Sequence, residues 1–193
     1  HQVPDARSWE YADGFVAPSP ALQEAREAAR ADQWEVLSNG TTALLAFLTR
    51  TMQASSVVTI GTDAGVSALA LLEGMSDHGV LTSIDPDAER QAAARKVLSL
   101  ARIRSNQVRL ITGTPLDVLP KLRDGAYDMV LINGDRLEYV EYVSQALRLL
   151  RTGGIVVVND ALANNHVADP DNEDDDTLII RETLDSVLET EEF

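Results

Sequence analysis

The chain of 193 residues contains no cysteine. Disulfides, thiolate metal sites and cysteine nucleophiles are therefore excluded, and this composition fits a cytoplasmic protein. No uncharged apolar run approaches the roughly 18 residues that span a membrane, so we expect no membrane partner. Positive charge is also scarce, because 16 lysine and arginine residues face 31 acidic ones, for a net charge of −15. So acidic a surface repels phosphate backbones, and we expect no nucleic-acid partner.

From residue 56 onward, short apolar segments alternate with segments of helical periodicity. This alternation predicts an α/β fold with a parallel sheet covered by helices on both faces. The predicted strands are Val57–Ile60, Val80–Asp85, Val108–Thr112, Tyr127–Asn133 and Ile155–Asn159. The helices predicted among and after them are Val66–Asp77, Asp87–Ala101, Leu116–Leu122, Glu138–Leu150 and Thr177–Leu188.

The first 55 residues have a different pattern. Proline and aromatic residues are frequent in His1–Pro20, which is typical of an irregular arm that packs on its own domain or on a second subunit. Two helices are predicted next, Pro20–Ala31 with Ser19 as N-cap and Thr41–Met52. We therefore expect one domain in which residues 1–55 pack on a core of residues 56–193. Because the chain does not begin with Met, we expect a trimmed or partial gene product.

The segment 169–176 carries six acidic residues in eight and is typical of a solvated, mobile loop. A calcium loop is the alternative, but the glycine and the final glutamate of an EF-hand are missing. His166, just before this segment, is expected to be an exposed loop residue rather than a general base. Tyr139 and Tyr142 lie one helical turn apart and are expected to pack a helix against the sheet.

A strand, a glycine turn and a helix follow one another around the sequence S-V-V-T-I-G-T-D-A-G at residues 56–65. This order exposes backbone N–H groups to a nucleotide-like ligand at the carboxyl end of a strand. Gly61 and Gly65 alone are a weak signal, because close helix–strand packing uses the same spacing. The signal strengthens with Asp85 at the end of the next strand, where a carboxylate can accept both ribose hydroxyls. The alternative role for Asp85 is a helix N-cap.

The later strand ends favour one ligand over others. The chain reads T-I-G-T-D-A-G-V-S at 59–67, Y-D-M-V-L-I-N-G-D-R-L-E-Y at 127–139, L-L-R-T-G-G at 149–154 and N-D at 159–160. In these motifs, over residues 38–162, it resembles the cation-dependent, catechol-type O-methyltransferases, particularly compact bacterial members. The resemblance implies a doubly wound, mostly parallel, Rossmann-like class I methyltransferase fold with extra N-terminal helices, and a homodimer. It also implies strand order 3-2-1-4-5-7-6, with a final hairpin that the chain ends before.

The resemblance implies S-adenosylmethionine as cofactor and a small, for example phenolic, hydroxyl compound as acceptor. The residues that would bind the cofactor are Gly61, Thr62, Asp63, Gly65, Ser67, Asp85, Gly113, Thr114 and Asn133. Among them, Asp85 would hold the ribose, Gly113 and Thr114 would face the adenine, and Asp63 would reach or crowd the ammonium group.

Relatives of this type hold a divalent cation such as Mg²⁺, which lowers the pKa of the acceptor hydroxyl. The resemblance places the metal at Asn133, Asn159 and Asp160, but here one carboxylate and two amides replace two carboxylates and an amide. Hard cations rely on carboxylate oxygens, so we expect a weak or absent metal site. Arg136 stands where relatives have a lysine and stays protonated, so it cannot act as a base.

Three interpretations of the chemistry stay open. A metal-independent enzyme would use Arg136 to stabilise a developing phenolate, with the proton passing to Asp160, Asp135 or water. A weakly metal-dependent enzyme would recruit Asp135 or the acidic segment. A dimeric protein would bind the cofactor without turnover. An NAD-dependent oxidoreductase is a fourth, less supported alternative, because the glycine spacing is not G-x-G-x-x-G.

Overall fold

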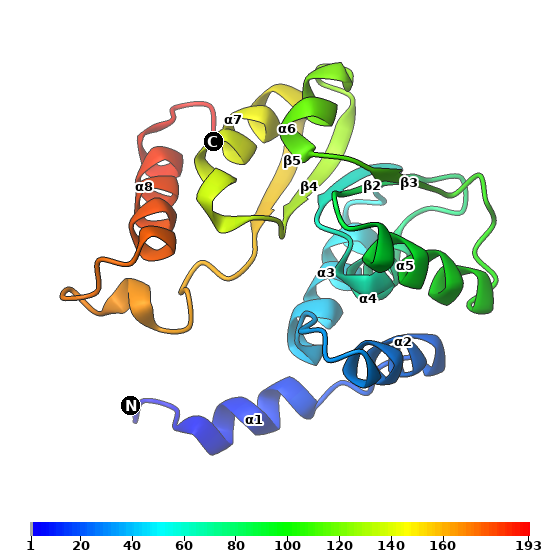
Figure 1. Ribbon diagram of the computed structural model, residues 1–193, viewed down its shortest axis with the longest axis horizontal. Helices are drawn as coiled ribbons and strands as arrows, with labels where there is room; N and C mark the ends of the chain where they lie inside the picture. Colours follow the sequence, from blue (N-terminus) through cyan, green and yellow to red (C-terminus); the bar gives the residue numbers. More distant parts are fainter. Residues whose placement is uncertain (1) are drawn as a thin grey trace.

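The computed structural model describes residues 2–193 and contains one five-stranded sheet (Figure 1). The strand order is β3-β2-β1-β4-β5, and every neighbouring pair is parallel. The strands are β1 Ser56–Ile60, β2 Val80–Asp85, β3 Val108–Thr112, β4 Tyr127–Ile132 and β5 Leu150–Val158. The predicted α/β fold is confirmed, as is the order of these strands. Within residues 2–193 no strand follows β5.

The helices account for most of the remaining chain. They are α1 Ala6–Gly14, α2 Pro20–Ala31, α3 Asn39–Thr51, α4 Val66–Gly74, α5 Ala88–Leu100, α6 Pro115–Val118, α7 Tyr139–Leu149 and α8 Asp175–Glu189. Short 3₁₀ turns are η1 Asp63–Gly65, η2 Leu119–Lys121, η3 Arg136–Glu138 and η4 His166–Ala168. The predicted helices are confirmed within a few residues, and Ser19 caps α2 by accepting a hydrogen bond from the Leu22 N–H. In the described part of the chain, no helix has the length and apolar character needed to cross a membrane.

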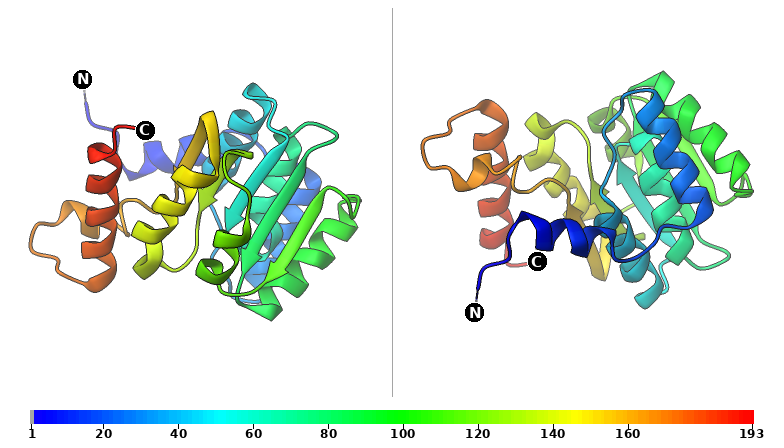
Figure 2. Two further views of the ribbon diagram at one scale, coloured as in Figure 1. Left: turned by 90° about the horizontal axis from the view of Figure 1, so that it is seen from above. Right: turned by 90° about the horizontal axis from the view of Figure 1, so that it is seen from below.

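Helices cover both faces of the sheet, as Figure 2 shows from two sides. Successive side chains of a strand point to opposite faces, and both Val57 and Val58 of β1 are fully buried. Val57 packs in a core that α2, α3, α4 and α5 share, whereas Val58 packs in a second core with α6, α7 and α8. The carboxyl ends of the strands are thereby fixed in a rigid frame.

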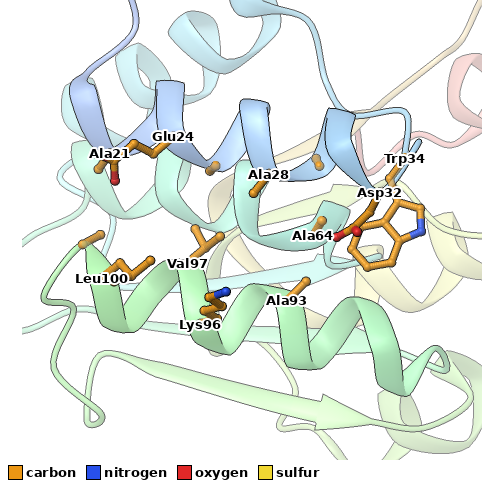
Figure 3. A pocket seen from close by; sticks show the side chains of 13 residues that line it. Ala21, Glu24, Ala28, Asp32, Trp34, Ala64, Ala93, Lys96, Val97 and Leu100 are labelled. Carbon is orange, nitrogen blue, oxygen red and sulfur yellow. The ribbon is translucent and has the colours of Figure 1, made fainter.

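A small apolar cavity of about 160 Å³ lies between α2 and α5 (Figure 3). Four alanines of α2 line one side of it, Ala93, Val97 and Leu100 of α5 line the other, and Trp34 and Ala64 border it at one end. Small side chains on facing helices leave such a gap because neither can reach across it. The cavity is therefore a consequence of how these two helices pack.

The irregular arm expected at the N-terminus is partly wrong, since it contains the helix α1. Asp5 caps this helix by accepting a hydrogen bond from the Ser8 N–H. The predicted arm begins at His1, which lies outside the described residues. Trp9, Tyr11 and Phe15 are 65%, 72% and 71% exposed, so these rings do not pack on their own domain.

Strand β5 begins five residues before the predicted start, at Leu150 instead of Ile155. Gly153 and Gly154 therefore lie inside the strand, and the register against β4 shifts between Tyr127 and Met129. Gly153 has a φ of +82°, which glycine adopts without strain. The glycine pair forms an irregularity within a strand rather than a turn before it.

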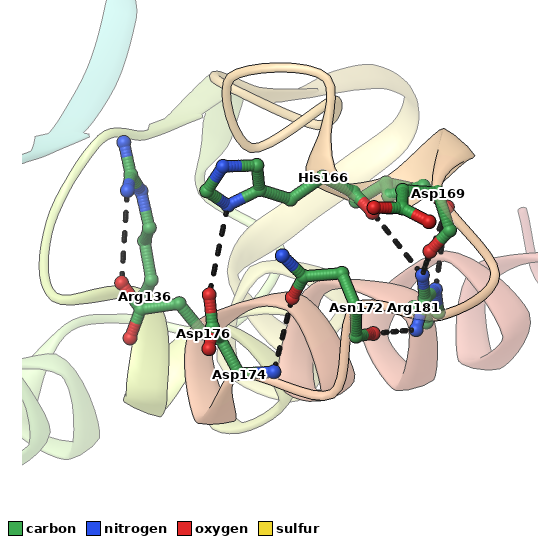
Figure 4. A network of polar contacts seen from close by, with 8 residues as sticks. Arg136, His166, Asp169, Asn172, Asp174, Asp176 and Arg181 are labelled. Carbon is green, nitrogen blue, oxygen red and sulfur yellow. Dashed lines mark hydrogen bonds and ion pairs between the residues drawn. The ribbon is translucent and has the colours of Figure 1, made fainter.

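The acidic segment 169–176 is exposed, as expected, but the backbone of the segment and of the residues just before it is hydrogen-bonded to one side chain (Figure 4). The guanidinium of Arg181 donates hydrogen bonds to backbone carbonyl oxygens at positions 166, 167, 169 and 172. Asp175 and Asp176 form the first turn of α8, where negative charge is favourable. The connection from β5 to α8 is therefore fastened at its centre and its end.

Candidate functional site

The turn after β1 has an unusual backbone. Gly61, Asp63, Ala64 and Gly65 all have positive φ values, between +51° and +95°. A Cβ atom on Gly61 would lie 2.1 Å from the carbonyl oxygen of Asn133, so only glycine fits there. Positive φ costs a non-glycine residue about 1–2 kcal/mol, and such strain clusters at functional sites.

Asp85, at the tip of β2, holds this turn in place. Its carboxylate accepts hydrogen bonds from the Thr62 N–H at 2.9 Å and from the Asp87 N–H at 2.8 Å. The N-cap alternative for Asp85 is wrong, because Asp87 caps α5 by accepting from the Glu89 and Arg90 N–H groups. Asp85 is only 5% exposed, yet it borders two clefts at the sheet edge.

The two clefts lie side by side across the carboxyl ends of the strands and share Asp85, Arg90 and Asn133. The first has a volume of about 480 Å³ and the second about 520 Å³, within the usual range for ligand sites. Gly61 and Thr114 also line the first cleft. The second cleft is more polar, and its further lining includes Ser38, Thr41, Asp63, Arg136, Asn159 and Asp160.

Most of the predicted cofactor residues border these clefts, but some do not. Thr62 and Ser67 are fully buried, with the Thr62 hydroxyl bonded to the Ser83 hydroxyl. The Ser67 hydroxyl donates to the Thr62 carbonyl oxygen. Neither they nor Gly65 and Gly113 line the two clefts. The buried hydroxyl groups of Thr62 and Ser67 therefore stabilise the turn through hydrogen bonds in the interior and do not face the clefts.

At the positions that would hold the metal, Asn133 and Asn159 are hydrogen-bonded to each other, and Asp160 is paired with the guanidinium of Arg136. The Asn159 amide donates to the Asn133 side-chain oxygen at 2.8 Å, and Arg136 donates to the Asp160 carboxylate. Among residues 2–193, no group of three or more His, Cys, Asp or Glu side chains is arranged to hold a metal ion. One carboxylate that is already paired with Arg136 and two amides that are bonded to each other are a poor ligand set for a hard divalent cation.

Asp135 and His166 stand apart from Asp160. The Asp135 carboxylate accepts a hydrogen bond from the Leu137 N–H and borders the first cleft, not the second. His166 is half exposed, and its Nδ1 lies 3.8 Å from Asp174 (Figure 4), so the expected exposed histidine is confirmed. The geometry thus brings together Arg136 and Asp160 of the predicted catalytic residues.

Several lining residues were not predicted as site residues, among them Arg90 and Tyr142. Arg90 borders both clefts, and its guanidinium carbon lies 6.0 Å from the Trp34 ring centre, a cation–π arrangement. Tyr142 is buried against the sheet, as predicted for packing, but it also borders the first cleft and donates to Glu138. In the sequence, the one signal for Arg90 as a site residue is its position in the first turn of the helix after β2.

Asp63 is a buried carboxyl group in the turn η1, and it accepts a hydrogen bond from the Leu37 N–H at 3.2 Å. Burial raises the pKa of Asp63 from 3.8 to about 7, although the Leu37 N–H, Arg26 and Arg90 act in the opposite direction. Arg26 also donates to the Leu37 carbonyl oxygen. Both the N–H and the carbonyl group of Leu37 are thus fixed beside the second cleft.

Asp63→Asn should stabilise the fold at alkaline pH. The folded chain keeps a proton on Asp63 up to about pH 7, whereas the unfolded chain releases it near pH 3.8. Wild-type stability should therefore fall as the pH rises through this window and stay low above it. Asparagine still accepts from Leu37 without a charge, so the variant should gain about 2–4 kcal/mol over wild type at pH 8 and little at pH 4.

Urea unfolding of both proteins at pH 4 and pH 8 measures this difference. The control is the variant Asp77→Asn, at an exposed position. Its free energy of unfolding should differ from that of wild type by the same amount at both pH values. A stability difference between Asp63→Asn and wild type that does not change with pH would contradict the buried, raised-pKa carboxyl group.

The fold and clefts define a class of protein. A doubly wound parallel sheet with a glycine turn after β1 and a buried carboxylate ending β2 is typical of Rossmann-like enzymes that bind a nucleoside-containing cofactor. The sequence model of the O-methyltransferase family matches residues 15–192. The chain therefore belongs to the O-methyltransferase family, and the predicted family and enzyme class are confirmed.

Individual relatives agree with this assignment. A protein of Mycobacterium tuberculosis, the probable O-methyltransferase Rv1220c, is 37% identical over 183 residues, which cover 95% of this chain and 82% of the relative. The solved structure of the O-methyltransferase TomG of Streptomyces achromogenes, involved in tomaymycin synthesis and in complex with SAM, is 27% identical. It covers 96% of this chain and 85% of TomG with a TM-score of 0.85. Cofactor-bound Rv0187 of M. tuberculosis is 28% identical, with a TM-score of 0.87 over 98% of this chain and 88% of Rv0187.

Proposed function

We propose that the chain transfers a methyl group from S-adenosylmethionine to a hydroxyl of a small acceptor without a divalent cation. The observation that carries the metal-free part is the Arg136–Asp160 ion pair at the family's metal position. The structural likeness to TomG, which was solved with SAM, supports the choice of cofactor.

In this proposal the cofactor lies across both clefts. Asp85 accepts hydrogen bonds from the ribose, and Thr114, with Gly113 behind it, borders the adenine in the first cleft. Asp63, in the second cleft, faces the ammonium group. S-adenosylmethionine, when bound, supplies an electrophilic methyl group on its sulfonium sulfur. The chain supplies the binding surface and the strained glycine turn that brings backbone close to the ligand.

The acceptor hydroxyl would lie in the second cleft, beside Arg136 and Asp160. Arg136 donates hydrogen bonds to the oxygen as negative charge develops on it, and Asp160 takes the proton and passes it to water. Asp135, which faces Leu137, is not needed for this step. The amides of Asn133 and Asn159 orient the acceptor through hydrogen bonds.

Calorimetry and a turnover assay test the proposal. S-adenosylmethionine and S-adenosylhomocysteine should bind with micromolar affinity, and NAD should not bind. With a panel of phenols and catechols, methylation should change less than twofold when EDTA replaces Mg²⁺. Binding of NAD alone would overturn the cofactor assignment, and turnover that requires Mg²⁺ would overturn the metal-free chemistry. Tight cofactor binding without methylation of any acceptor would favour the binding-only alternative.

We further propose a homodimer in the cytoplasm, in which residues 1–55 carry the subunit contact and residues 56–193 the cofactor. The exposed rings of Trp9, Tyr11 and Phe15 lie on or beside α1, and the exposed Phe47 of α3 borders a cleft with the arm. Several large apolar side chains exposed in one part of the chain favour an interface.

Sedimentation velocity should give a dimer for the wild type and a monomer for a Trp9→Ser, Phe15→Ser double variant. Leu188→Ser, at an exposed apolar position outside the arm, should stay dimeric. A wild-type monomer at all concentrations, or a dimeric double variant, would exclude this interface.

A further inference from the structure

Arg136 is held between two carboxylates from distant parts of the chain. One side of its guanidinium donates to Asp160 just after β5, and its Nη1 lies 3.6 Å from an oxygen of Asp176 in the first turn of α8 (Figure 4). Arg136 is 32% exposed and Asp160 24%, whereas Asp176 is 48% exposed. Asp160, the inner carboxylate, therefore faces the second cleft, and Asp176, the outer carboxylate, faces solvent.

The charges at this position differ from those of the family pattern, in which two carboxylates and a dication lie beside a lysine. Here Asn133 replaces one carboxylate, and Arg136 keeps the positive charge of the lysine. Arg136 pairs with the remaining carboxylate, Asp160, so the pair is neutral without a dication. The Asn133–Asn159 hydrogen bond uses amide groups that a metal ion would otherwise need as ligands.

The backbone at the inner carboxylate is strained. Asp160 has a φ of +58°, which costs a non-glycine residue about 1–2 kcal/mol. A charge-assisted hydrogen bond from Arg136 is strong enough to offset a cost of this size. The Arg136–Asp160 ion pair therefore offsets the conformational cost of the turn at Asp160.

Asp176 is fixed by its helix. The start of α8 is tied down by Arg181, and Ile180 of the same helix is fully buried in the core. Asp176 does not line either cleft, and its contact there is with Arg136, which lines the second cleft. Its geometry is that of a positioning residue, which acts on Arg136.

We infer that the Arg136 guanidinium occupies the place of the family's divalent cation and that Asp176 holds it there. The inference deepens the proposed function and rests on it for the role of the cleft. It also defines the class of acceptor. A guanidinium binds oxygen through hydrogen bonds and does not require a pair of ligand oxygens as a chelated cation does, so a phenol with one hydroxyl is a suitable acceptor as well as a catechol.

Electron paramagnetic resonance of Mn²⁺ tests the occupancy of the site without cofactor or acceptor. Wild type should leave the free Mn²⁺ signal unchanged at millimolar concentration. Asn133→Asp with Asn159→Asp should bind Mn²⁺ weakly, because Arg136 still opposes it. Adding Arg136→Met should tighten binding at least tenfold. Equal affinity with and without Arg136, or submillimolar binding by wild type, would overturn the inference.

Nuclear magnetic resonance of the Arg136 Nε–H group tests the role of Asp176 in single variants, which stay folded if the triple variant does not. Its signal is assigned from its loss in Arg136→Met. Asp176→Asn should speed solvent exchange of this proton at least threefold, whereas Asp175→Asn, the neighbouring surface change, should not. Equal exchange in both variants would overturn the role of Asp176. Neither measurement involves S-adenosylmethionine, so failure of the proposed function, seen by calorimetry, is distinguishable from failure here.

Discussion

Gly61→Ala should abolish cofactor binding and destabilise the fold by about 2–5 kcal/mol, the sum of overpacking and positive-φ costs. The new Cβ would lie 2.1 Å from the Asn133 carbonyl oxygen and 2.7 Å from its carbonyl carbon. The backbone cannot move aside easily, because the Gly61 N–H donates to Ile84 and the Asn133 N–H donates to Ile60. Relief would require β1 and β4 to separate at the edge that forms the cleft.

Urea unfolding and calorimetry with S-adenosylmethionine measure the two effects separately. Gly125→Ala is the matched control, because Gly125 has a φ of +59° but no atom lies within 4 Å of the place that its new methyl group would take. It should lose only about 1 kcal/mol and keep its cofactor affinity. If both variants lost the same stability, backbone conformation rather than the close approach to β4 would explain the glycine.

Arg136→Met should lower kcat by about 10²–10³, the range seen when a donor to a developing oxyanion is removed. Affinity for S-adenosylmethionine should stay within threefold of wild type, because Arg136 lies on the acceptor side. Arg136→Lys keeps the charge but loses the planar fork, so it should recover part of the rate. The measurement is kcat and KM on the phenol that wild type methylates fastest.

Arg151→Met provides the control for this experiment. Arg151 also pairs with an aspartate, Asp128, but at the opposite end of the strands. Its loss should lower stability and leave kcat unchanged. An Arg136→Met enzyme with wild-type kcat would show that the guanidinium does not act on the acceptor.

The sheet could be predicted because its signals are local. Val57, Val58 and Ile60 lie in one uncharged run, and such a run has few alternatives to a buried strand. Gly61 and Asp85 could be assigned to the site for a related reason, since the carboxyl ends of neighbouring parallel strands always meet at one edge. The direction of each strand thus gave the position of the clefts.

The contacts of the site could not be predicted, since they depend on distant segments. Arg136 meets Asp176 only because the β5–α8 connection folds back, and nothing near either residue encodes that path. Thr62 and Ser67 carry the family motif, but a motif does not tell whether a hydroxyl faces ligand or interior. The helix α1 was not predicted, because prolines and exposed aromatic residues are equally compatible with an irregular arm and with a short helix.

Arg181 reaches only backbone oxygens in the connection that leads from Asp160 to α8. Every amino acid supplies the same carbonyl group, so these contacts with Arg181 do not depend on the side chains at positions 166, 167, 169 and 172. Asn164, which borders the second cleft, makes none of these contacts, but its φ of +54° favours asparagine or glycine at that position. Substitutions that change the lining of the second cleft would therefore leave the Arg181 contacts in place, and with them the start of α8, where Asp176 meets Arg136.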